Sequence, residues 1–436
     1  MKKDWIEVEL KTIGEIVTGG TPSKNDFSNY SSKDFPFYKP TDLNQGILTV
    51  ESNDFLSSKA YASARKAPKN SILVTCIGAT IGKTGFIKRE GSFNQQINAI
   101  IPNGSIESKF LYYQIISQDF QNKIVHSSSS TTLPILNKSK FSILPIQVAP
   151  LPEQRAIVAR IEELFSELDH AIANLKSAQA KLEIYRQAVL KKAFEGGFTN
   201  GEKWQWKKFR DCGSWKGGGT PSKANHSFWE SGTVLWVSPK DMKEKFISNT
   251  IDKITEEAIE NSSTKWISGG SVLFVVRSGI LRRTLPIAIS KVDLTVNQDL
   301  QAFTPNSDLD PVFVYWFCKS RERDIRETCA KDGTTVESVD STSLKNYLIP
   351  FPSALELQTQ IVQEIESRLS VADKLAETIQ INLLKSESLR QSILKQAFEG
   401  KLLTEVELEA CRKEADWEPA EKLLERIKGE KKKLTT

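Results

Sequence analysis

The chain of 436 residues contains one internal duplication. The segment Gly19–Lys24, with the sequence GGTPSK, recurs unchanged as Gly218–Lys223, 199 positions later. Further matches follow in the same order at offsets between 199 and 204: Trp5 with Trp204, Gly14 with Gly213, Asn94-Gln95 with Asn297-Gln298, and Ala193–Gly196 with Ala397–Gly400. Because the offset drifts so little, the copies differ by few insertions. Two copies are too few for a solenoid, so we expect two similar domains related by pseudo-symmetry.

The first 150 or so residues of each copy are rich in Gly, Pro, Ser and Thr and carry short β-branched runs between turn signals. Such runs are typical of strands. We expect strands at Ser71–Ile77, Gly85–Lys88, Ile97–Ile101, Thr233–Val237 and Ser271–Arg277, and helices that include Phe110–Ser117 and Phe313–Ser320. This predicts an α+β class for each globular domain.

Each copy then becomes helical, with a narrow apolar stripe that repeats every seven residues. This is the pattern of a coiled-coil seam. The seam residues that we expect in the two helices are Ile161, Leu164, Leu168, Leu175, Leu182, Val189, Ile365, Leu369, Ile379, Leu383 and Ile393. Ser386 and Arg390 interrupt the second stripe. Each helix could pack on its own domain, but the matching lengths favour pairing of the two helices, and we expect an antiparallel coiled coil. A parallel pair would place both domains at one end.

These patterns divide the chain into five segments, with a Phe-Glu-Gly sequence as the stop of each long helix. The expected segments are a first globular domain at 1–150, a central helix at 151–196, a second globular domain at 197–352, a distal helix at 353–400, and a charged tail with a short helix at 401–436. Trp417 and nearby leucines give that tail an apolar face, which we expect to dock on a partner or on the chain itself.

Composition excludes several classes of protein. No N-terminal apolar stretch indicates a secretory signal, and no apolar run approaches the roughly 18–20 residues that span a bilayer, so we expect a cytoplasmic protein. The five cysteines are scattered and include no C-x-x-C pair, which indicates reduced structural thiols. The three histidines have no neighbouring ligands at metal spacing, so no metal site is expected.

The positive charge lies in the globular segments. The net charge is +5 for residues 1–150 and +2 for residues 197–352, whereas residues 151–196 are neutral and residues 353–400 carry −2. A mild positive excess of this kind is compatible with a polyanionic partner for the two domains.

One glycine-rich segment, Gly78–Thr84, resembles a phosphate-binding P-loop but has three residues between its glycines where that motif needs four. A strand rather than a helix is expected to follow it, which also argues against nucleotide binding. Its second copy, Ser278–Arg283, keeps basic residues. Such a loop can present Lys or Arg to a phosphate or to a guanine edge.

The other repeated loops each allow two interpretations. The GGTPSK loops are structural turns or phosphate contacts, the Asn-Gln pairs are turn caps or adenine readers, and the hydroxyl-rich loops are plain surface or phosphate contacts. The candidate DNA-binding residues are Thr21, Ser23, Lys24, Lys39, Gly82, Lys83, Gln95, Thr131, Thr132, Thr220, Ser222, Lys223, Lys240, Arg277, Arg282, Arg283, Gln298, Thr334 and Thr335.

No catalytic pattern appears in the sequence. It has no Ser/His/Asp grouping, no dinucleotide-binding glycine motif after a strand, and no Asn-Pro-Pro-aromatic motif of the kind found in adenine methyltransferases. A binding protein is therefore favoured over an enzyme.

Taken together, the motifs resemble those of the specificity subunits of type I restriction–modification systems. The resemblance covers the whole length and rests on Trp5, Gly14 and Gly19–Pro22 with their second copy, on Pro150–Arg155 before the first helix, on Ala193–Gly196 with its repeat, and on Trp417–Lys428. The second copy departs at Pro352–Gln358, which leaves the start of its helix uncertain.

The resemblance implies two target-recognition domains that each read one half of a bipartite, asymmetric DNA site through loops in the major groove. It implies helices that set the spacer and dock two modification (adenine methyltransferase) subunits, and a third, restriction subunit that acts as motor and nuclease. S-adenosylmethionine, ATP and Mg²⁺ would belong to these partners, with no cofactor in this chain. The alternatives are a two-headed protein-binding scaffold on a coiled coil, or an enzyme with an unrecognised site, such as a methyltransferase.

Overall fold

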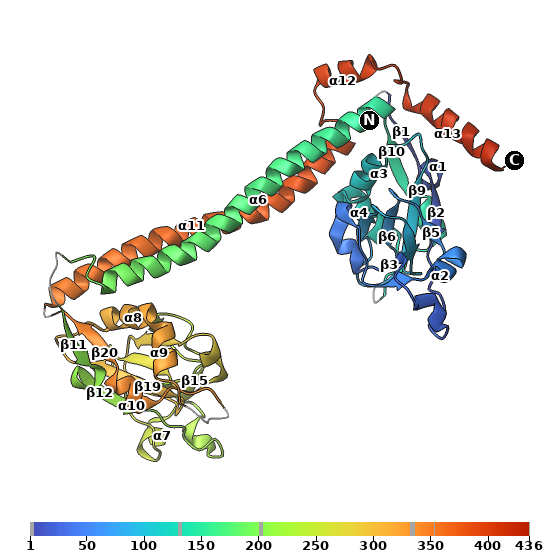
Figure 1. Cartoon of the computed structure of the whole chain (residues 1–436). Helices are drawn as coiled ribbons and strands as arrows, with labels where there is room; N and C mark the ends of the chain where they lie inside the picture. Colours follow the sequence, from blue (N-terminus) through green and yellow to red (C-terminus); the bar gives the residue numbers. More distant parts are fainter. Residues whose placement is uncertain (1–3, 130–132, 200–203, 332–335, 353, 436) are drawn as a thin grey trace. The chain divides into compact units, whose positions relative to one another are not determined.

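The computed structural model describes residues 4–129, 133–199, 204–331, 336–352 and 354–435. The chain forms two compact units (Figure 1). Unit 1 comprises Met1–Leu175 with Ile381–Thr436, and unit 2 comprises Lys176–Gln380. The boundaries cut both long helices, so each unit contains one globular domain and one half of each helix.

The globular domain of unit 1 is built from three small sheets with helices packed against them (Figure 1). Its sheets have the strand orders β2-β9-β6-β7, β4-β3-β8-β5 and β1-β10. The strands are β1 Ile6–Glu9, β2 Gly14–Thr18, β3 Phe35–Tyr38, β4 Phe55–Leu56, β5 Lys66–Ala67, β6 Ile72–Thr75, β7 Thr84–Phe86, β8 Gly91–Phe93, β9 Ile97–Pro102 and β10 Pro145–Val148. The α-helices are α1 Leu10–Ile13, α2 Ser58–Ser63, α3 Ser108–Ile115, α4 Gln118–Ser127 and α5 Lys138–Ser142.

The globular domain of unit 2 repeats this topology. Its sheets have the orders β12-β19-β16-β17-β14, β15-β13-β18 and β11-β20. The strands are β11 Gln205–Lys208, β12 Gly213–Gly217, β13 Val234–Val237, β14 Phe246–Ile247, β15 Asp252–Ile254, β16 Val272–Val275, β17 Ile287–Ser290, β18 Thr295–Val296, β19 Leu300–Pro305 and β20 Leu348–Phe351. The α-helices are α7 Glu256–Glu260, α8 Pro311–Ser320, α9 Glu322–Thr328 and α10 Ser341–Asn346. The predicted α+β class and duplication are confirmed.

The burial of the central strands explains why they could be predicted from the sequence. All four residues of β6 and all four of β16 are buried, so these strands read as short continuous apolar runs. In the register of β2 against β9, Ile16 lies opposite Ile100, and both side chains belong to the larger core of the domain, whereas Ile97 and Ala99 of β9 belong to a second one. All five cysteines lie buried as free thiols, which confirms the expectation of structural cysteines.

The long helices are α6, Leu151–Phe194, and α11, Leu355–Phe398, each of 44 residues. One glutamine organises the start of each. The Gln154 side chain accepts from the Glu107 amide at 3.0 Å and donates to the Ala149 carbonyl at 2.7 Å, and Gln358 makes the matching bonds with Asp310 and Pro352. The changed sequence before α11 therefore leaves its N-terminal junction intact.

The glycines of the Phe-Glu-Gly sequences end both helices, as predicted. Gly196 and Gly400 have φ values of 81° and 70°, in the left-handed region that glycine adopts at little cost. The following amides then bond back into the last turn, Gly197 to Lys192 and Lys401 to Gln396.

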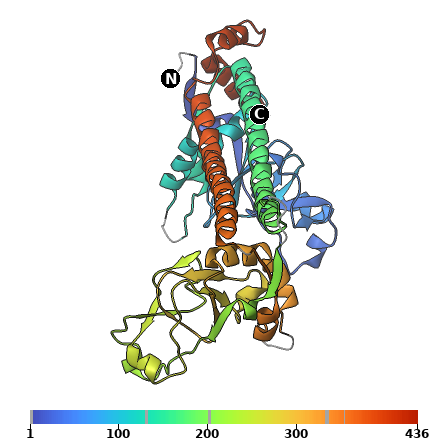
Figure 2. The same ribbon diagram turned by 90° about the vertical axis from the view of Figure 1, so that its left-hand side faces the viewer.

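Within each unit the segments of α6 and α11 pair in antiparallel directions (Figure 2). Most predicted seam residues are buried or half-buried, from Ile161 and Leu168 in α6 to Ile365 and Ile379 in α11. Arg390, which appeared to interrupt the seam, takes part in the pairing: it forms an ion pair with Asp169 and its guanidinium lies 4.9 Å from the Phe165 ring centroid. In unit 2, Arg186 pairs with Asp373 at 2.6 Å.

The C-terminal tail folds onto unit 1 as two helices, α12 Glu405–Arg412 and α13 Ala420–Thr435. The sequence predicted only one helix here. Leu408, Leu423 and Ile427 join the core that also contains Trp5, and Arg155 contacts both Asp416, at 2.8 Å, and Glu414, at 2.6 Å. The expected docking of the tail is thus observed within the chain itself.

Candidate nucleic-acid interface

In unit 1 the glycine-rich loop after β2 and the Asn-Gln turn before β9 form one site. The Gly19 and Gly20 amides donate to the carbonyls of Ile97 and Phe93, at 3.0 and 2.9 Å. The Thr21 hydroxyl donates to Gln95 Oε1 at 2.6 Å, and both side chains are exposed. Because Oε1 is occupied, the Gln95 amide is oriented with its NH₂ group available as a donor.

Unit 2 repeats this arrangement. The Gly219 amide donates to the Val296 carbonyl at 3.0 Å, and the Thr220 hydroxyl donates to Gln298 Oε1. The two motifs singled out separately in the sequence are therefore partners in both units. This pairing of the two loops could not be predicted from the sequence, because more than 70 residues separate them in each copy.

The first glycine of each loop is required by close backbone approach. A Cβ on Gly19 would clash with the carbonyl oxygens of Phe93 and Asn94, and a Cβ on Gly218 would clash with those of Val296 and Asn297. Gly20 differs from them, since a Cβ there would meet nothing within 4 Å. The structural and the ligand-binding interpretations of GGTPSK are thus compatible: glycine builds the turn, and the hydroxyl and lysine that follow are exposed.

The lysines and serines of the two loops lie on the surface. Ser23, Lys24, Ser222, Lys223 and Lys240 are exposed. Lys39 is half-buried and forms an ion pair with Asp54 at 2.5 Å, so its charge is partly compensated.

The P-loop-like segment of unit 1 forms a tight turn into β7, the strand that was predicted to follow it. Gly82 has a φ of 85° and is buried beneath the Gln121 side chain, which donates to its carbonyl at 3.0 Å. Gly82 therefore serves the turn and offers no side chain to a ligand, whereas the neighbouring Lys83 is half-buried with side-chain surface available.

In unit 2 three arginines lie at, or just before, the equivalent turn. Arg282 and Arg283 are exposed at the end of a short 3-10 helix, Gly279–Arg282, and the Arg282 Nε donates to Glu337 at 3.1 Å. Arg277 lies just after β16 and donates through Nε to Asp299 at 2.8 Å. The hydroxyl-loop candidates Thr131, Thr132, Thr334 and Thr335 lie outside the described residues.

A cleft of about 810 Å³ opens beside the Gln298 loop in unit 2. Its lining includes Pro239, Arg277, Ser278, Gln298, Asp299 and Gln301. Arg277, Ser278 and Gln298 thus border one concave, polar surface, which can accept a ligand that has hydrogen-bond acceptor atoms.

Burial raises the pKa of Tyr38 and that of Cys76 to about 12, so these two groups near the loops of unit 1 are neutral at physiological pH. Charge on the two surfaces comes from lysine, arginine and the carboxylates paired with them. In the part of the chain that the structure describes, no group of His, Cys, Asp and Glu side chains could hold a metal ion.

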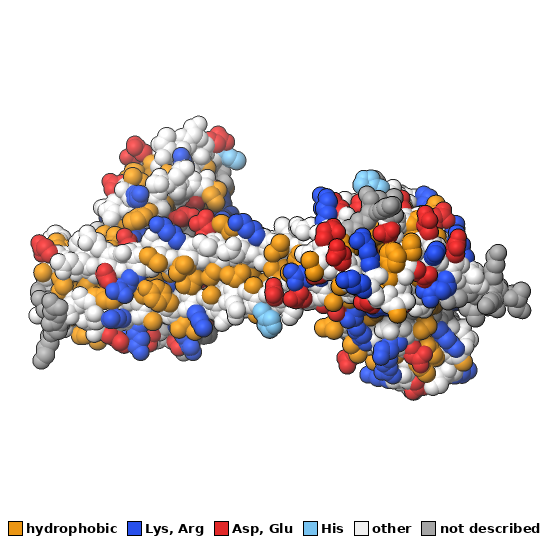
Figure 3. Space-filling view, turned by 90° about the horizontal axis from the view of Figure 1, so that it is seen from above, with side chains coloured by type: hydrophobic (Ala, Val, Ile, Leu, Met, Phe, Trp, Pro, Cys, Tyr) orange, Lys and Arg blue, Asp and Glu red, His pale blue; other side chains and the backbone are white. Residues whose placement is uncertain are grey.

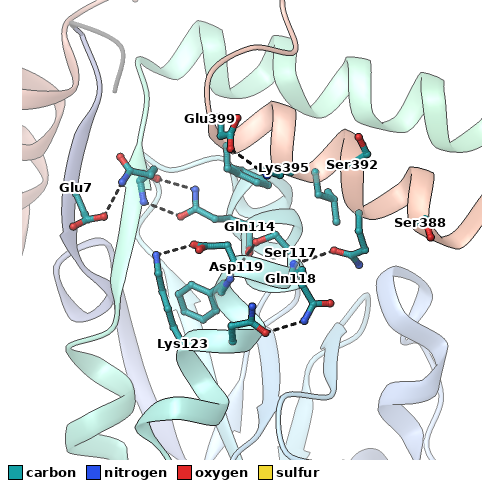
Figure 4. A pocket seen from close by; sticks show the side chains of 16 residues that line it. Glu7, Gln114, Ser117, Gln118, Asp119, Lys123, Ser388, Ser392, Lys395 and Glu399 are labelled. Carbon is teal, nitrogen blue, oxygen red and sulfur yellow. Dashed lines mark hydrogen bonds and ion pairs between the residues drawn. The ribbon is translucent and has the colours of Figure 1, made fainter.

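A second cavity, of about 680 Å³, lies in unit 1 between α4, the β1-β10 pair and the end of α11 (Figure 4). Several of its polar groups are paired: Gln391 accepts from the Gln118 amide at 2.9 Å, Lys123 pairs with Asp119 at 2.9 Å, and Gln147 donates to Glu7 at 2.8 Å, although Gln147 Oε1 is buried without a hydrogen-bond partner. The cavity thus lies at a junction between the globular domain and the helix α11.

A family model described as "Type I restriction modification DNA specificity domain" matches the chain twice, over residues 2–177 and 201–385. These ranges correspond to the two copies of the duplication. The chain therefore belongs to the family of type I restriction–modification DNA specificity proteins.

Similar proteins have names of the same kind. The specificity subunit of the type I restriction enzyme EcoR124I/EcoR124II from Escherichia coli is 36% identical over 253 residues, which cover 57% of this chain and 60% of that protein. The EcoKI specificity subunit from E. coli strain K12 is 23% identical over 99% of this chain and 96% of its own length.

Solved structures share the fold. A chain from a study titled "Structural basis underlying complex assembly andconformational transition of the type I R-M system" superposes with a TM-score of 0.71 at 18% identity, covering 92% of this chain and 99% of that one. The HsdS subunit from Thermoanaerobacter tengcongensis gives a TM-score of 0.63 at 17% identity, covering 92% and 98%. Among the described residues no helix is both long and apolar enough to span a membrane.

Proposed function

We propose that this chain is the DNA-recognition subunit of a type I restriction–modification complex, in which each globular domain reads one half of a bipartite, asymmetric target. The observation that carries this proposal is the repeated Thr-Gln pair, Thr21 with Gln95 and Thr220 with Gln298, on the same frame in both units. The frame is shared while the neighbouring side chains differ, Lys83 against Arg282 and Arg283. Residues that both units share suit contacts to the DNA backbone, which is the same in both half-sites. Residues that differ between the units suit two different base sequences.

The two long helices are proposed to set the spacer between the half-sites and to dock two modification subunits. Several large apolar side chains of the helices are exposed: Ile184, Val371 and Leu375 in unit 2, and Leu384 and Leu389 in unit 1. Figure 3 shows apolar side chains in a row along the helices. Exposed apolar surface of this extent is typical of protein-protein contact sites, and helices without a positive excess suit protein partners more than DNA.

Catalysis is assigned to the partners. We propose that adenine methylation with S-adenosylmethionine takes place on the modification subunits, and that a restriction subunit supplies ATP- and Mg²⁺-dependent translocation and cleavage. This chain would then be non-catalytic. Its polar clusters support this division, because the carboxylates of both surfaces are paired with lysine or arginine. The cytoplasmic location stays a prediction.

Electrophoretic mobility shift with a pool of duplexes tests the proposal. The full chain with modification subunits is expected to retain a subset of sequences in the presence of excess random competitor, with binding that weakens steeply as salt rises. A protein-binding scaffold would retain no DNA, and a methyltransferase with an unrecognised site would bind S-adenosylmethionine as the isolated chain. Either result would reject the proposal.

A further inference from the structure

Arg277 is an oriented cation on the polar cleft of unit 2. Its side chain is 57% exposed, and it borders the cleft together with Gln298 and Ser278. Arg277 Nε donates to Asp299 Oδ1 at 2.8 Å. Among the described residues the two terminal Nη groups have no hydrogen-bond partner. The contact of Nε with Asp299 therefore orients the guanidinium and leaves both Nη groups available as donors.

Asp299 is itself rigidly held. Asn297 Nδ2 donates to Asp299 Oδ2 at 3.2 Å, and the Asp299 amide donates back to Asn297 Oδ1 at 3.0 Å. The Asp299 carbonyl accepts from the Val276 amide at 2.8 Å and the Arg277 amide at 3.3 Å. Asn297, Asp299 and Arg277 therefore form a chain of contacts that presets the arginine before any ligand binds, which lowers the entropic cost of binding.

Unit 1 has the same scaffold with different side chains. The Cys76 amide donates to the Gln96 carbonyl at 2.7 Å, as Val276 does to Asp299, so Ile77 stands at the position of Arg277 and Gln96 at that of Asp299. Asn94 holds the Gln96 side chain at 2.9 Å, just as Asn297 holds Asp299. The duplication thus supplies an internal comparison: the support is kept, and the group at the surface changes from a cation to an apolar side chain.

The chemistry of this pair favours a base over a phosphate. Two parallel N–H donors of arginine match guanine O6 and N7, the commonest base-specific contact in the major groove. The Asp299 carboxylate offsets the charge of Arg277 and would repel a phosphate placed beside it. A neutral base edge with two acceptors suits this arrangement better.

We propose that Arg277, positioned by Asp299, is a specificity-determining residue that reads a guanine in the half-site bound by unit 2. Ile77 and Gln96 do not read guanine at the equivalent position of the other half-site. This inference rests on the DNA-recognition function proposed above.

Selection from a randomised duplex library, by the full chain in complex with its modification subunits, tests the proposal. The wild-type complex is expected to select a guanine at one position of one half-site. Arg277→Ala and Arg277→Lys should both reduce the preference for that guanine by roughly 5- to 150-fold, and leave the other half-site unchanged. Lysine keeps the charge but lacks the two-donor fork. Asp299→Asn should reduce the preference by a smaller factor.

Arg323→Ala is the matched control, because Arg323 is an exposed arginine of unit 2 that pairs with Glu327 and does not line the cleft. Thermal unfolding shows whether each variant is folded. A uniform loss of affinity for all sequences in Arg277→Ala, restored in Arg277→Lys, would identify a phosphate contact and overturn the inference. An unchanged base preference in both variants would overturn it too. A wild-type complex with no sequence preference would instead refute the proposed function.

Discussion

The Thr21 hydroxyl donates to Gln95 Oε1 at 2.6 Å, although 74 residues separate them, and Thr220 makes the same bond to Gln298. Each bond orients one glutamine amide beside a lysine-bearing loop. The two units therefore share a hydrogen-bonded Thr-Gln pair on the surface that we propose to bind DNA.

Replacement of one glutamine should weaken one half-site. Gln95→Ala is expected to lower the affinity for the specific duplex by about 2- to 12-fold, the range for one neutral hydrogen bond of about 0.5–1.5 kcal/mol. Gln298→Ala should lower the affinity by a similar factor through the other half-site. Competition binding with duplexes in which only one half is intact separates the two effects. Equal affinities for wild type and both variants would exclude the pair from the interface.

Substitution of the loop glycines tests whether close backbone approach is the reason for the first glycine of the loop. Gly19→Ala places a Cβ against the carbonyls of Phe93 and Asn94, so the loop must move, at a cost of about 1–3 kcal/mol. Binding to the half-site of unit 1 should fall, and thermal unfolding of unit 1 should shift downward. Gly20→Ala is the control, because its Cβ would meet nothing within 4 Å. If both variants lose the same stability, close approach is not the reason for the first glycine.

The docking of the C-terminal tail on unit 1 should weaken in acid. Hydrogen bonds from Arg155 hold the pKa of Asp416 below its ordinary value of 3.8. A lowered pKa means that the contact stabilises the docked tail above the ordinary value, and that this contribution is lost as the pH falls through the lowered pKa. The protection factors of the Leu408 and Leu423 backbone amides, which correct for the pH dependence of intrinsic exchange, should therefore fall below about pH 4.

Arg155→Ala should lower the same protection factors at pH 7 and should reduce their dependence on acid. Arg323→Ala is the control, since Arg323 is an exposed arginine of unit 2 that pairs with Glu327 one turn away in α9, whereas the tail belongs to unit 1. A tail that stays protected in Arg155→Ala at all pH values would show that the apolar contacts of Leu408, Leu423 and Ile427 suffice.

The spacer should follow helix length. Removal of seven residues from the middle of α6, together with seven from the middle of α11, shortens each helix by about 10.5 Å at 1.5 Å per residue. This equals about 3 base pairs at 3.4 Å each, so selected duplexes should have a spacer shorter by about that number. Selection of an unchanged spacer by a folded variant would refute the role of the helices as a ruler.

The features that the sequence predicted are local or periodic. The heptad stripe, the stops at Gly196 and Gly400, and the buried run of β6 depend on neighbouring residues and on helix or strand geometry. The duplication added the correspondence of the two domains, because the same residues recur at a nearly constant offset.

The features that the sequence did not predict depend on contacts between distant segments. The bond of Thr21 to Gln95, the ion pair of Arg155 with Asp416 and the support of Arg277 by Asp299 each join loops that only the fold brings together. Gly82 is an instructive case: its glycine-rich sequence resembled a ligand loop, yet Gln121 on α4 covers it. The helix α12 also depends on docking for its place, since its polar sequence has few apolar residues to reveal it.

Mapping of methylated adenines in cells that carry this chain with its modification subunits, against cells that lack the chain, tests the central claim most directly. Two different recognition surfaces on one duplicated frame predict methylation at a single bipartite motif, with two dissimilar halves and a spacer of fixed length. Methylation that does not depend on the chain, or a motif that is a strict palindrome or has no spacer, would contradict the account.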